Sequence, residues 1–227
     1  MDLGVRADSP RNFFRYVNTR TWMDMAIKYC SNCGAPVSMR IPALDNRARY
    51  VCDACDTTHY VNPKIVAGCI PESGERILLC RRAIEPCLGM WTLPAGFMEM
   101  GESTVEAAIR ETWEEAEASV EVDSLFALFS IPHISQVYIM FRAGLPRDEY
   151  APGPESLEVA LFREEEIPWS QLAFPVISRT LECYFSDKRA GAFRVHIGDI
   201  RNRMPQQPSD KMKQLSSSGR SVHPHDC

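Results

Sequence analysis

Residues 96–115 read GFMEMGESTVEAAIRETWEE, and this stretch combines a helix start with a concentration of acidic side chains. Ser103 and Glu106 have the spacing of a capping box, so a helix is predicted from residue 103 to about residue 118. Its inner face is predicted from residues that recur at helical spacing, namely Val105, Ala108, Ile109, Thr112 and Ala116.

On this helix, Glu111, Glu114 and Glu115 stand at positions i, i+3 and i+4, so their carboxylates share one side. Like charges repel there, whereas a solvated helix face normally mixes the two signs. A Mg²⁺ ion would relieve the repulsion because it prefers carboxylate and phosphate oxygens. Arg110 can hold one carboxylate in a bidentate contact, and Gly96 lets the backbone approach a metal or phosphate. The pattern indicates a metal-dependent site for a phosphate substrate.

The segment resembles the Nudix box, G-x5-E-x7-R-E-U-x-E-E-x-G-U, in which U is a bulky aliphatic residue. The matching positions are Gly96, Glu102, Arg110, Glu111, Glu114 and Glu115. The departures are Thr112, Glu117 and Ala118, and Glu117 stands where the family usually has a glycine that ends the helix. Because Glu117 does not belong to the acidic cluster, activity is expected to survive.

The resemblance implies a role for each matched residue. Glu111 and Glu115 are expected to be the principal ligands of a catalytic Mg²⁺ (or Mn²⁺), and Glu114 a further ligand or the group that orients water. The Gly96 carbonyl would complete the cofactor site, and Arg110 and Glu102 would orient the cluster. The catalytic residues within the box are therefore expected to be Arg110, Glu114 and Glu115.

Many members of the family take their general base from a loop outside the box. Glu155 and Glu158 follow the Pro-Gly-Pro turn at residues 152–154 and are the candidates. We favour Glu158 as the catalytic base, with a solvated loop residue as the alternative for either.

Two cysteine pairs precede this region. Cys30 and Cys33, and then Cys52 and Cys55, each have two residues between them, and 18 residues separate the pairs. Two such knuckles can supply four thiolates to a tetrahedral Zn²⁺. Because four cysteines close the coordination sphere, the predicted zinc is structural and not catalytic.

The chain divides into four regions. Residues 1–27 are read as a flexible extension, 28–62 as a zinc ribbon, 63–200 as the catalytic domain and 201–227 as a disordered tail, because the tail has few large apolar side chains. Within the catalytic domain, strands are predicted at 65–70, 76–82, 120–130, 135–144, 157–162 and 193–197, with a second helix at 174–185. This order predicts an α+β fold, a mixed sheet between helices, which is the α/β/α sandwich that the Nudix resemblance implies.

Composition and charge limit the partners and the cellular compartment that are expected. The net charge is −5, so no broad basic field favours nucleic acid as the partner. No apolar run approaches the roughly 20 residues of a membrane span. Nine cysteines without a disulfide pattern suit a reducing compartment, and the cytoplasm is the expected location. A homodimer is left open.

The resemblance covers about residues 28–200. Residues 62–64, 91–96, 152–158 and 172–175 are similar to a zinc-ribbon branch of the family found in bacteria and plants, whose plant members hydrolyse ADP-ribose and FAD. The expected substrate is therefore a nucleotide derivative whose diphosphate is cleaved to release AMP. An NADH pyrophosphatase is the alternative, although residues 135–141 lack its Pro/Trp stretch. A non-catalytic ADP-ribose sensor is a further alternative, disfavoured because every acidic box position is kept.

Four aromatic residues are candidates for a surface that stacks a base, although most aromatic residues in strands belong to the core: Trp91, Phe97, Phe129 and Tyr138.

Overall fold

The structure, a computed structural model, describes residues 27–201. The predicted flexible extension and disordered tail lie outside the described residues, apart from residues 27 and 201. Within the described range, no helix is long and apolar enough to cross a membrane.

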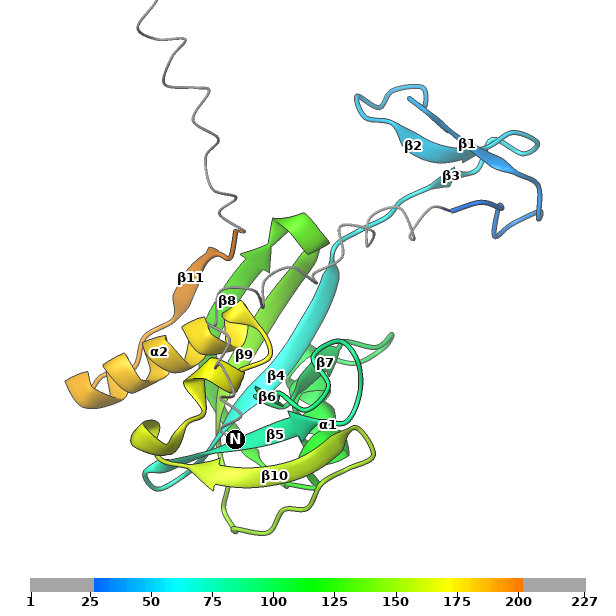
Figure 1. Cartoon of the computed structure of the whole chain (residues 1–227). Helices are drawn as coiled ribbons and strands as arrows, with labels where there is room; N and C mark the ends of the chain where they lie inside the picture. Colours follow the sequence, from blue (N-terminus) through cyan, green and yellow to red (C-terminus); the bar gives the residue numbers. More distant parts are fainter. Residues whose placement is uncertain (1–26, 202–227) are drawn as a thin grey trace, which may run out of the picture.

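The N-terminal module is a small antiparallel sheet. Strands β1 (Val37–Arg40), β2 (Arg49–Cys52) and β3 (Thr58–His59) pair in the order β1-β2-β3. A four-residue segment joins β3 to the main sheet, and Figure 1 shows the module standing beyond the end of that sheet. This sheet lies within residues 28–62, the region predicted as a zinc ribbon.

The main body contains a mixed sheet in the order β10-β5-β4-β9-β8-β11. Its strands are β4 (Lys64–Ser73), β5 (Arg76–Arg82), β8 (Glu121–Ile131), β9 (Gln136–Gly144), β10 (Ser156–Phe162) and β11 (His196–Asp199), with the short β6 (Trp91–Thr92) on β5 and β7 (Ala95–Phe97) on β4. The pairs β4–β9 and β8–β11 are parallel, and the other pairs are antiparallel.

A helix lies on each face of this sheet (Figure 1). Successive residues of a strand point to opposite faces. Accordingly, Val66 of β4 joins the core under α2 (Pro175–Ala190), while Ala67 packs against α1 (Thr104–Ala116). Short 3₁₀ turns occur at Pro132–Ile134, Glu164–Glu166 and Trp169–Gln171. The predicted mixed sheet between helices is confirmed.

Several predicted boundaries change. β4 runs through Pro71 to Ser73, so the interval between the strands predicted at 65–70 and 76–82 shrinks to Gly74 and Glu75. The second helix extends to Ala190, where Gly191 in the left-handed region ends it. The last strand lies at His196–Asp199 and not at 193–197, because its parallel pairing with β8 begins at His196.

The start of α1 is confirmed, but its predicted inner face is partly wrong. Ser103 caps the helix and forms the complete capping box with Glu106. Ala108, Thr112 and Ala116 are buried as predicted, together with Ala107 and Glu115, whereas Val105 and Ile109 are exposed. The helix turns its small residues and one carboxylate inward because the sheet and β7 approach it closely. Glu117 ends the helix by adopting φ 46°, the left-handed conformation for which glycine is the usual residue.

Candidate active site

Arg110 is the centre of the acidic cluster. Its Nε and Nη2 donate to the two carboxylate oxygens of Glu102 at 3.0 and 2.8 Å. Its Nη1 donates to Glu111 at 2.8 Å and to Glu114 at 2.9 Å, and its Nη2 also donates to the Phe97 carbonyl at 3.1 Å. The expectation of one bidentate partner is met by Glu102, and Arg110 additionally links the helix to the loop after Gly96.

Glu102 connects the loop before α1 to Arg110 of that helix. Hydrogen bonds from Arg110 and from the Glu99 amide lower the pKa of Glu102 to about 2. The carboxylate is therefore ionised and committed to these donors. Its position agrees with an orienting role, and both of its oxygens are already engaged by Arg110.

Glu115 is the most buried acid of the box, with 6% of its surface exposed. Burial, and then the charge of Glu111, raises its pKa to about 8. Its Oε2 is buried and has no hydrogen-bond partner among the described residues. A buried carboxylate oxygen without a donor is costly. A divalent cation would satisfy this oxygen, so the residues present fit the metal that the box implies.

The three helix carboxylates are not gathered around one point. Within residues 27–201, the four cysteines are the one group of metal-binding side chains whose ligand atoms all lie within 4.8 Å of one another. Arg110 donates to Glu111 and Glu114, and its hydrogen bonds do not include the buried Glu115. A Mg²⁺ held here would take its remaining ligands from water and phosphate oxygens, as this ion usually does.

Gly96 lies against Glu111. A Cβ at Gly96 would be 2.3 Å from the Glu111 carboxyl carbon, a distance that forces displacement. Glu111 is half-buried, and burial raises its pKa despite the hydrogen bond from Arg110. Glycine is therefore needed at this position because the Glu111 carboxylate occupies the space that a Cβ would fill.

We expect Gly96→Ala to reduce kcat by about 10²-fold or more, because moving a catalytic group by about 1 Å can cost that factor. Steady-state kinetics on the purified variant would check this. Gly198→Ala is the matched control, since a Cβ there would meet its nearest neighbour, Phe129, at 3.7 Å. A Gly96→Ala enzyme as active as the control would contradict this account of the close contact.

The loop between β9 and β10 is hydrogen-bonded to the end of α1. The Gly153 amide donates to the Glu115 carbonyl at 3.1 Å, and the Ala151 amide donates to the Ala116 carbonyl at 2.9 Å. A Cβ at Gly153 would be 1.8 Å from the Glu114 carbonyl oxygen, so only glycine fits. This contact brings Glu155 close enough for its charge to raise the pKa of both Glu111 and Glu115.

Glu158 lies further along β10 and faces Arg81, whose Nη1 is 3.5 Å from its Oε2. A β-bulge between Ser156 and Glu158 shifts the register and sets Glu158 opposite Arg81. The role predicted for Glu158 stays a prediction, and Glu155 is the acid of this loop that acts electrostatically on the cluster.

Arg82 is a residue of the site that the sequence did not predict. Its charge lowers the pKa of Glu115 and of Tyr138, and its guanidinium lies 5.2 Å from the centre of the Phe174 ring. Within the described residues it forms no salt bridge, although its Nε donates to the Pro86 carbonyl. A cation that is close to the carboxylates but unpaired can contact a phosphate. No local motif marks Arg82, because the sheet alone brings β5 beside α1.

Of the four aromatic candidates, three are core and one is not. Trp91, Phe129 and Tyr138 are buried. Phe97, next to Gly96, is 44% exposed, and Lys64 Nζ lies 4.7 Å from its ring centre. Phe97 is therefore the aromatic of this set that has a face open to a ligand.

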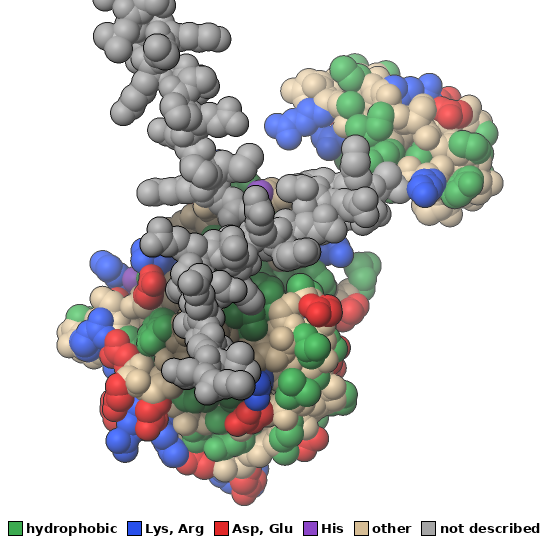
Figure 2. Space-filling view, in the orientation of Figure 1, with side chains coloured by type: hydrophobic (Ala, Val, Ile, Leu, Met, Phe, Trp, Pro, Cys, Tyr) green, Lys and Arg blue, Asp and Glu red, His purple; other side chains and the backbone are tan. Residues whose placement is uncertain are grey.

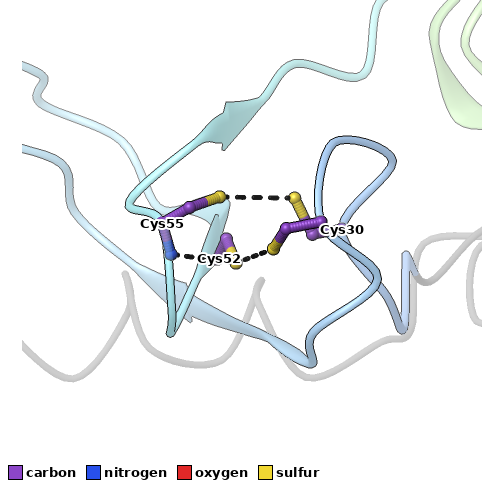
Figure 3. Close-up of side chains that lie close together, drawn as sticks. Cys30, Cys52 and Cys55 are labelled. Atoms are coloured by element: carbon purple, nitrogen blue, oxygen red, sulfur yellow. Dashed lines mark hydrogen bonds between the residues drawn. The ribbon is translucent and has the colours of Figure 1, made fainter.

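The four cysteines of the ribbon converge. The Cys30 and Cys55 sulfurs are 3.7 Å apart, and those of Cys33 and Cys52 are 3.5 Å apart. Zn–S bonds of ~2.3 Å in a tetrahedron place sulfurs about 3.8 Å apart. Figure 3 shows Cys30 on a separate loop from Cys52 and Cys55, with its sulfur facing that of Cys55, so the residues present fit a structural zinc.

Comparison with known proteins agrees with this geometry. The NUDIX domain family matches residues 62–180, and the zinc-ribbon family described as Nudix N-terminal matches residues 28–61. The chain belongs to the Nudix family and is a pyrophosphohydrolase that carries an N-terminal zinc ribbon.

Three relatives show the kinds of protein that this chain is similar to. The ADP-ribose pyrophosphatase of Methanocaldococcus jannaschii is 34% identical over 51% of this chain and 69% of its own length. The NAD-capped RNA hydrolase NudC of Stutzerimonas stutzeri is 29% identical over 62% of this chain and 49% of its own, so the chain spans about half of it. The crystal structure of a NUDIX hydrolase from Nitrosomonas europaea is 52% identical with a TM-score of 0.76, covering 78% of this chain and all of that one.

Proposed function

We propose that this chain hydrolyses the diphosphate of ADP-ribose or FAD, releasing AMP, in a reaction that depends on Mg²⁺ or Mn²⁺. The observation that carries the proposal is the buried Glu115 oxygen without a partner, beside Glu111 and at the edge of the Arg110 network. A diphosphate bound at this point would bring the anionic oxygens that a divalent cation needs to complete its coordination.

Hydrolysis of a phosphoanhydride passes through a loose transition state, so the protein contributes mainly positioning and electrostatic stabilisation. In this proposal Glu111 and Glu115 would hold the cation, and Glu114 and the Gly96 carbonyl would be further ligands. When bound, it would withdraw charge from the phosphates and acidify a water. Arg110 keeps Glu102, Glu111 and Glu114 at fixed positions, and Arg82 supplies a positive charge for a phosphate oxygen.

A carboxylate must also take the proton of the attacking water. We propose Glu155 for this role ahead of Glu158, because the charge of Glu155 acts on Glu111 and Glu115 while Glu158 faces Arg81. The pyrophosphohydrolase class does not depend on which of the two acts.

Selectivity has to come from contacts outside the diphosphate, since the acidic cluster recognises only that part of the substrate. The exposed ring of Phe97 offers a stacking surface at the edge of the site, with Lys64 beside it. We propose that an aromatic group of the substrate stacks there. The name of the relative from Methanocaldococcus jannaschii supports ADP-ribose, and that of the NudC relative, an NAD-capped RNA hydrolase, supports a substrate with an NAD moiety as the alternative.

The test is a comparison of kcat/KM for ADP-ribose, FAD and NADH in the presence of Mg²⁺. We expect ADP-ribose or FAD to exceed NADH. Phe97→Ala should raise KM by roughly tenfold, since stacking of a base contributes about 1–3 kcal/mol. Leu157→Ala, an exposed apolar residue on β10, is the control and should leave KM unchanged. A clear preference for NADH would move the chain to the alternative substrate class.

A further inference from the structure

Arg81, near the end of β5, contacts two segments that border the candidate active site. Its Nε donates to the Gly89 carbonyl at 2.9 Å, and its Nη1 lies 3.5 Å from Oε2 of Glu158. Gly89 belongs to the loop between β5 and β6, and Glu158 belongs to β10, and these two strands pair with β5 along opposite edges (Figure 1). Arg81 therefore connects the loop at residues 83–90 to β10.

The side chain of Arg81 points away from the acidic cluster. Leu79 of the same strand enters the core under α2, whereas Cys80 packs with Ala116 of α1. Because successive residues of a strand point to opposite faces, Arg81 lies on the α2 side of the sheet, and its cross-strand partner Glu158 shares that side. The acids of the Nudix box stand on α1, on the other side. Any effect of this pair on the reaction is therefore exerted through the backbone and not by contact with the substrate.

The backbone that the pair holds contains the β-bulge of β10. The bulge lies between Ser156 and Glu158, where three residues of β10 stand opposite Arg82 and Arg81 of β5. A bulge bends its strand and changes the direction of nearby side chains, and bulges are frequent next to active sites. Glu155 directly precedes this bulge, so the direction of its carboxylate depends on how the bulge is held.

The segment around Glu155 has backbone contacts on two sides. On one side the Gly153 amide donates to the Glu115 carbonyl of α1 at 3.1 Å. On the other side the Ala83 amide, two residues after Arg81, donates to the Glu155 carbonyl at 2.8 Å. The contact with Ala83 joins Glu155 to the same loop that Arg81 holds through Gly89. Arg81 thus fixes both the bulge and the loop that supports Glu155.

We propose that Arg81, paired with Glu158, is a positioning residue for the carboxylate that takes the proton of the attacking water. This inference rests on the proposed function, in which Glu155 is that carboxylate. Arg81 keeps β10 and the loop at residues 83–90 at a fixed separation, and Glu155 lies between them. Glu158 then contributes to catalysis as the partner of Arg81, without touching the substrate.

The competing explanation is an exposed ion pair with no effect on the reaction. On the face of the main body shown in Figure 2, basic side chains lie next to acidic ones at several places. Such pairs contribute little to stability, so the loss of one should hardly change the melting temperature. A shift of about 1 Å in a catalytic group, by contrast, can lower the rate by about 10²-fold. The rate and the melting temperature therefore separate the two explanations.

The same strand offers a matched control. Arg76, at the other end of β5, forms a salt bridge with Asp148 in the loop between β9 and β10. The side chains of this pair are 41% and 45% exposed, against 42% and 53% for Arg81 and Glu158. Arg76→Ala thus removes a similar ion pair from the same strand without touching the bulge.

The experiment is steady-state kinetics of the full-length, zinc-loaded chain with ADP-ribose and Mg²⁺. We expect Arg81→Ala to lower kcat by about 10- to 100-fold with little change in KM, because a base is displaced while the diphosphate site is unchanged. Arg76→Ala should keep the wild-type kcat, and the two variants should have the same melting temperature. Arg81→Lys should recover only part of kcat, since an ammonium lacks the forked donors that reach both Gly89 and Glu158.

A second measurement does not depend on turnover. Hydrogen exchange of the amides at residues 83–90 and 151–158 should become faster in Arg81→Ala and stay unchanged in Arg76→Ala. Glu158→Gln should lower kcat in the same direction as Arg81→Ala. Combining it with Arg81→Ala should cause no further loss, because both substitutions remove one interaction.

A kcat for Arg81→Ala equal to that of Arg76→Ala would overturn the proposal, and so would losses from Arg81→Ala and Glu158→Gln that multiply in the double variant. Glu155→Gln distinguishes this failure from failure of the proposed function. If Glu155→Gln loses the roughly 10²–10⁴-fold expected of a general base while Arg81→Ala loses nothing, the positioning role alone is wrong. If Glu155→Gln keeps its activity, the base assignment is wrong and the role of Arg81 falls with it.

Discussion

Glu115→Gln should lower kcat for diphosphate hydrolysis by about 10³-fold or more, the scale of losing one well-placed charge in a catalytic site. Glutamine keeps the shape of the side chain but cannot supply the negative charge to a cation. The contacts of Arg110 with Glu102, Glu111 and Glu114 do not involve Glu115, so they should persist. Initial rates over a range of Mg²⁺ concentrations would measure the effect.

The same substitution should not destabilise the metal-free protein. The folded pKa of Glu115, about 8, lies above its ordinary value of 4.5 because the carboxylate is buried. A raised pKa means that stability present below pH 4.5 is lost as the pH rises towards 8. Glutamine does not ionise, so the variant should lose less stability over this range than the wild type, as seen in melting temperatures with a chelator.

The control is Glu117→Gln, an exposed acid at the end of the same helix that lies outside the cluster. It should keep nearly full activity. If Glu115→Gln were as active as Glu117→Gln, Glu115 would not be a metal ligand.

Cys52→Ser should abolish stoichiometric zinc binding and unfold the ribbon. The purified wild type is expected to hold about one zinc per chain, because four thiolates close a single tetrahedral site. Cys52 is buried and lies at the end of β2, so its loss removes both a ligand and the contact with Cys33. Binding of structural zinc is worth roughly 10–16 kcal/mol in comparable peptides, far more than so small a sheet could otherwise supply.

Metal content measured by mass spectrometry, together with proteolysis of residues 28–61, would report the change. Cys87→Ser is the control, because Cys87 is a free cysteine outside the cluster. The main body should remain folded in both variants, since its core is formed from other elements. A wild-type ribbon that is folded without any zinc would contradict the metal assignment.

Local spacing in the sequence was sufficient for the features that depend on neighbouring residues. Ser103 and Glu106 predicted the start of α1, and the box predicted which acids share that helix with Arg110. The two cysteine pairs predicted a cluster that the ribbon assembles. These signals depend on residues that are close together in the sequence, so they can be interpreted without knowledge of the fold.

Features that depend on distant segments could not be predicted. Val105 and Ile109 fit the apolar period, but periodicity does not reveal that α1 meets a close-packed surface with its alanines and Glu115. Arg82 reaches the cluster only because β5 and α1 are brought together by the sheet. The pairing of Glu158 with Arg81 follows from a β-bulge, and no residue pattern in that loop predicts the bulge.

The most direct test of the central claim is the product analysis of ADP-ribose incubated with the purified chain and Mg²⁺. We expect the wild type to form equal amounts of AMP and ribose 5-phosphate, a chelator to stop the reaction, and Glu115→Gln to form neither product. No turnover of ADP-ribose, FAD or NADH with any divalent cation, accompanied by tight binding of ADP-ribose, would contradict it and identify a sensor in place of an enzyme.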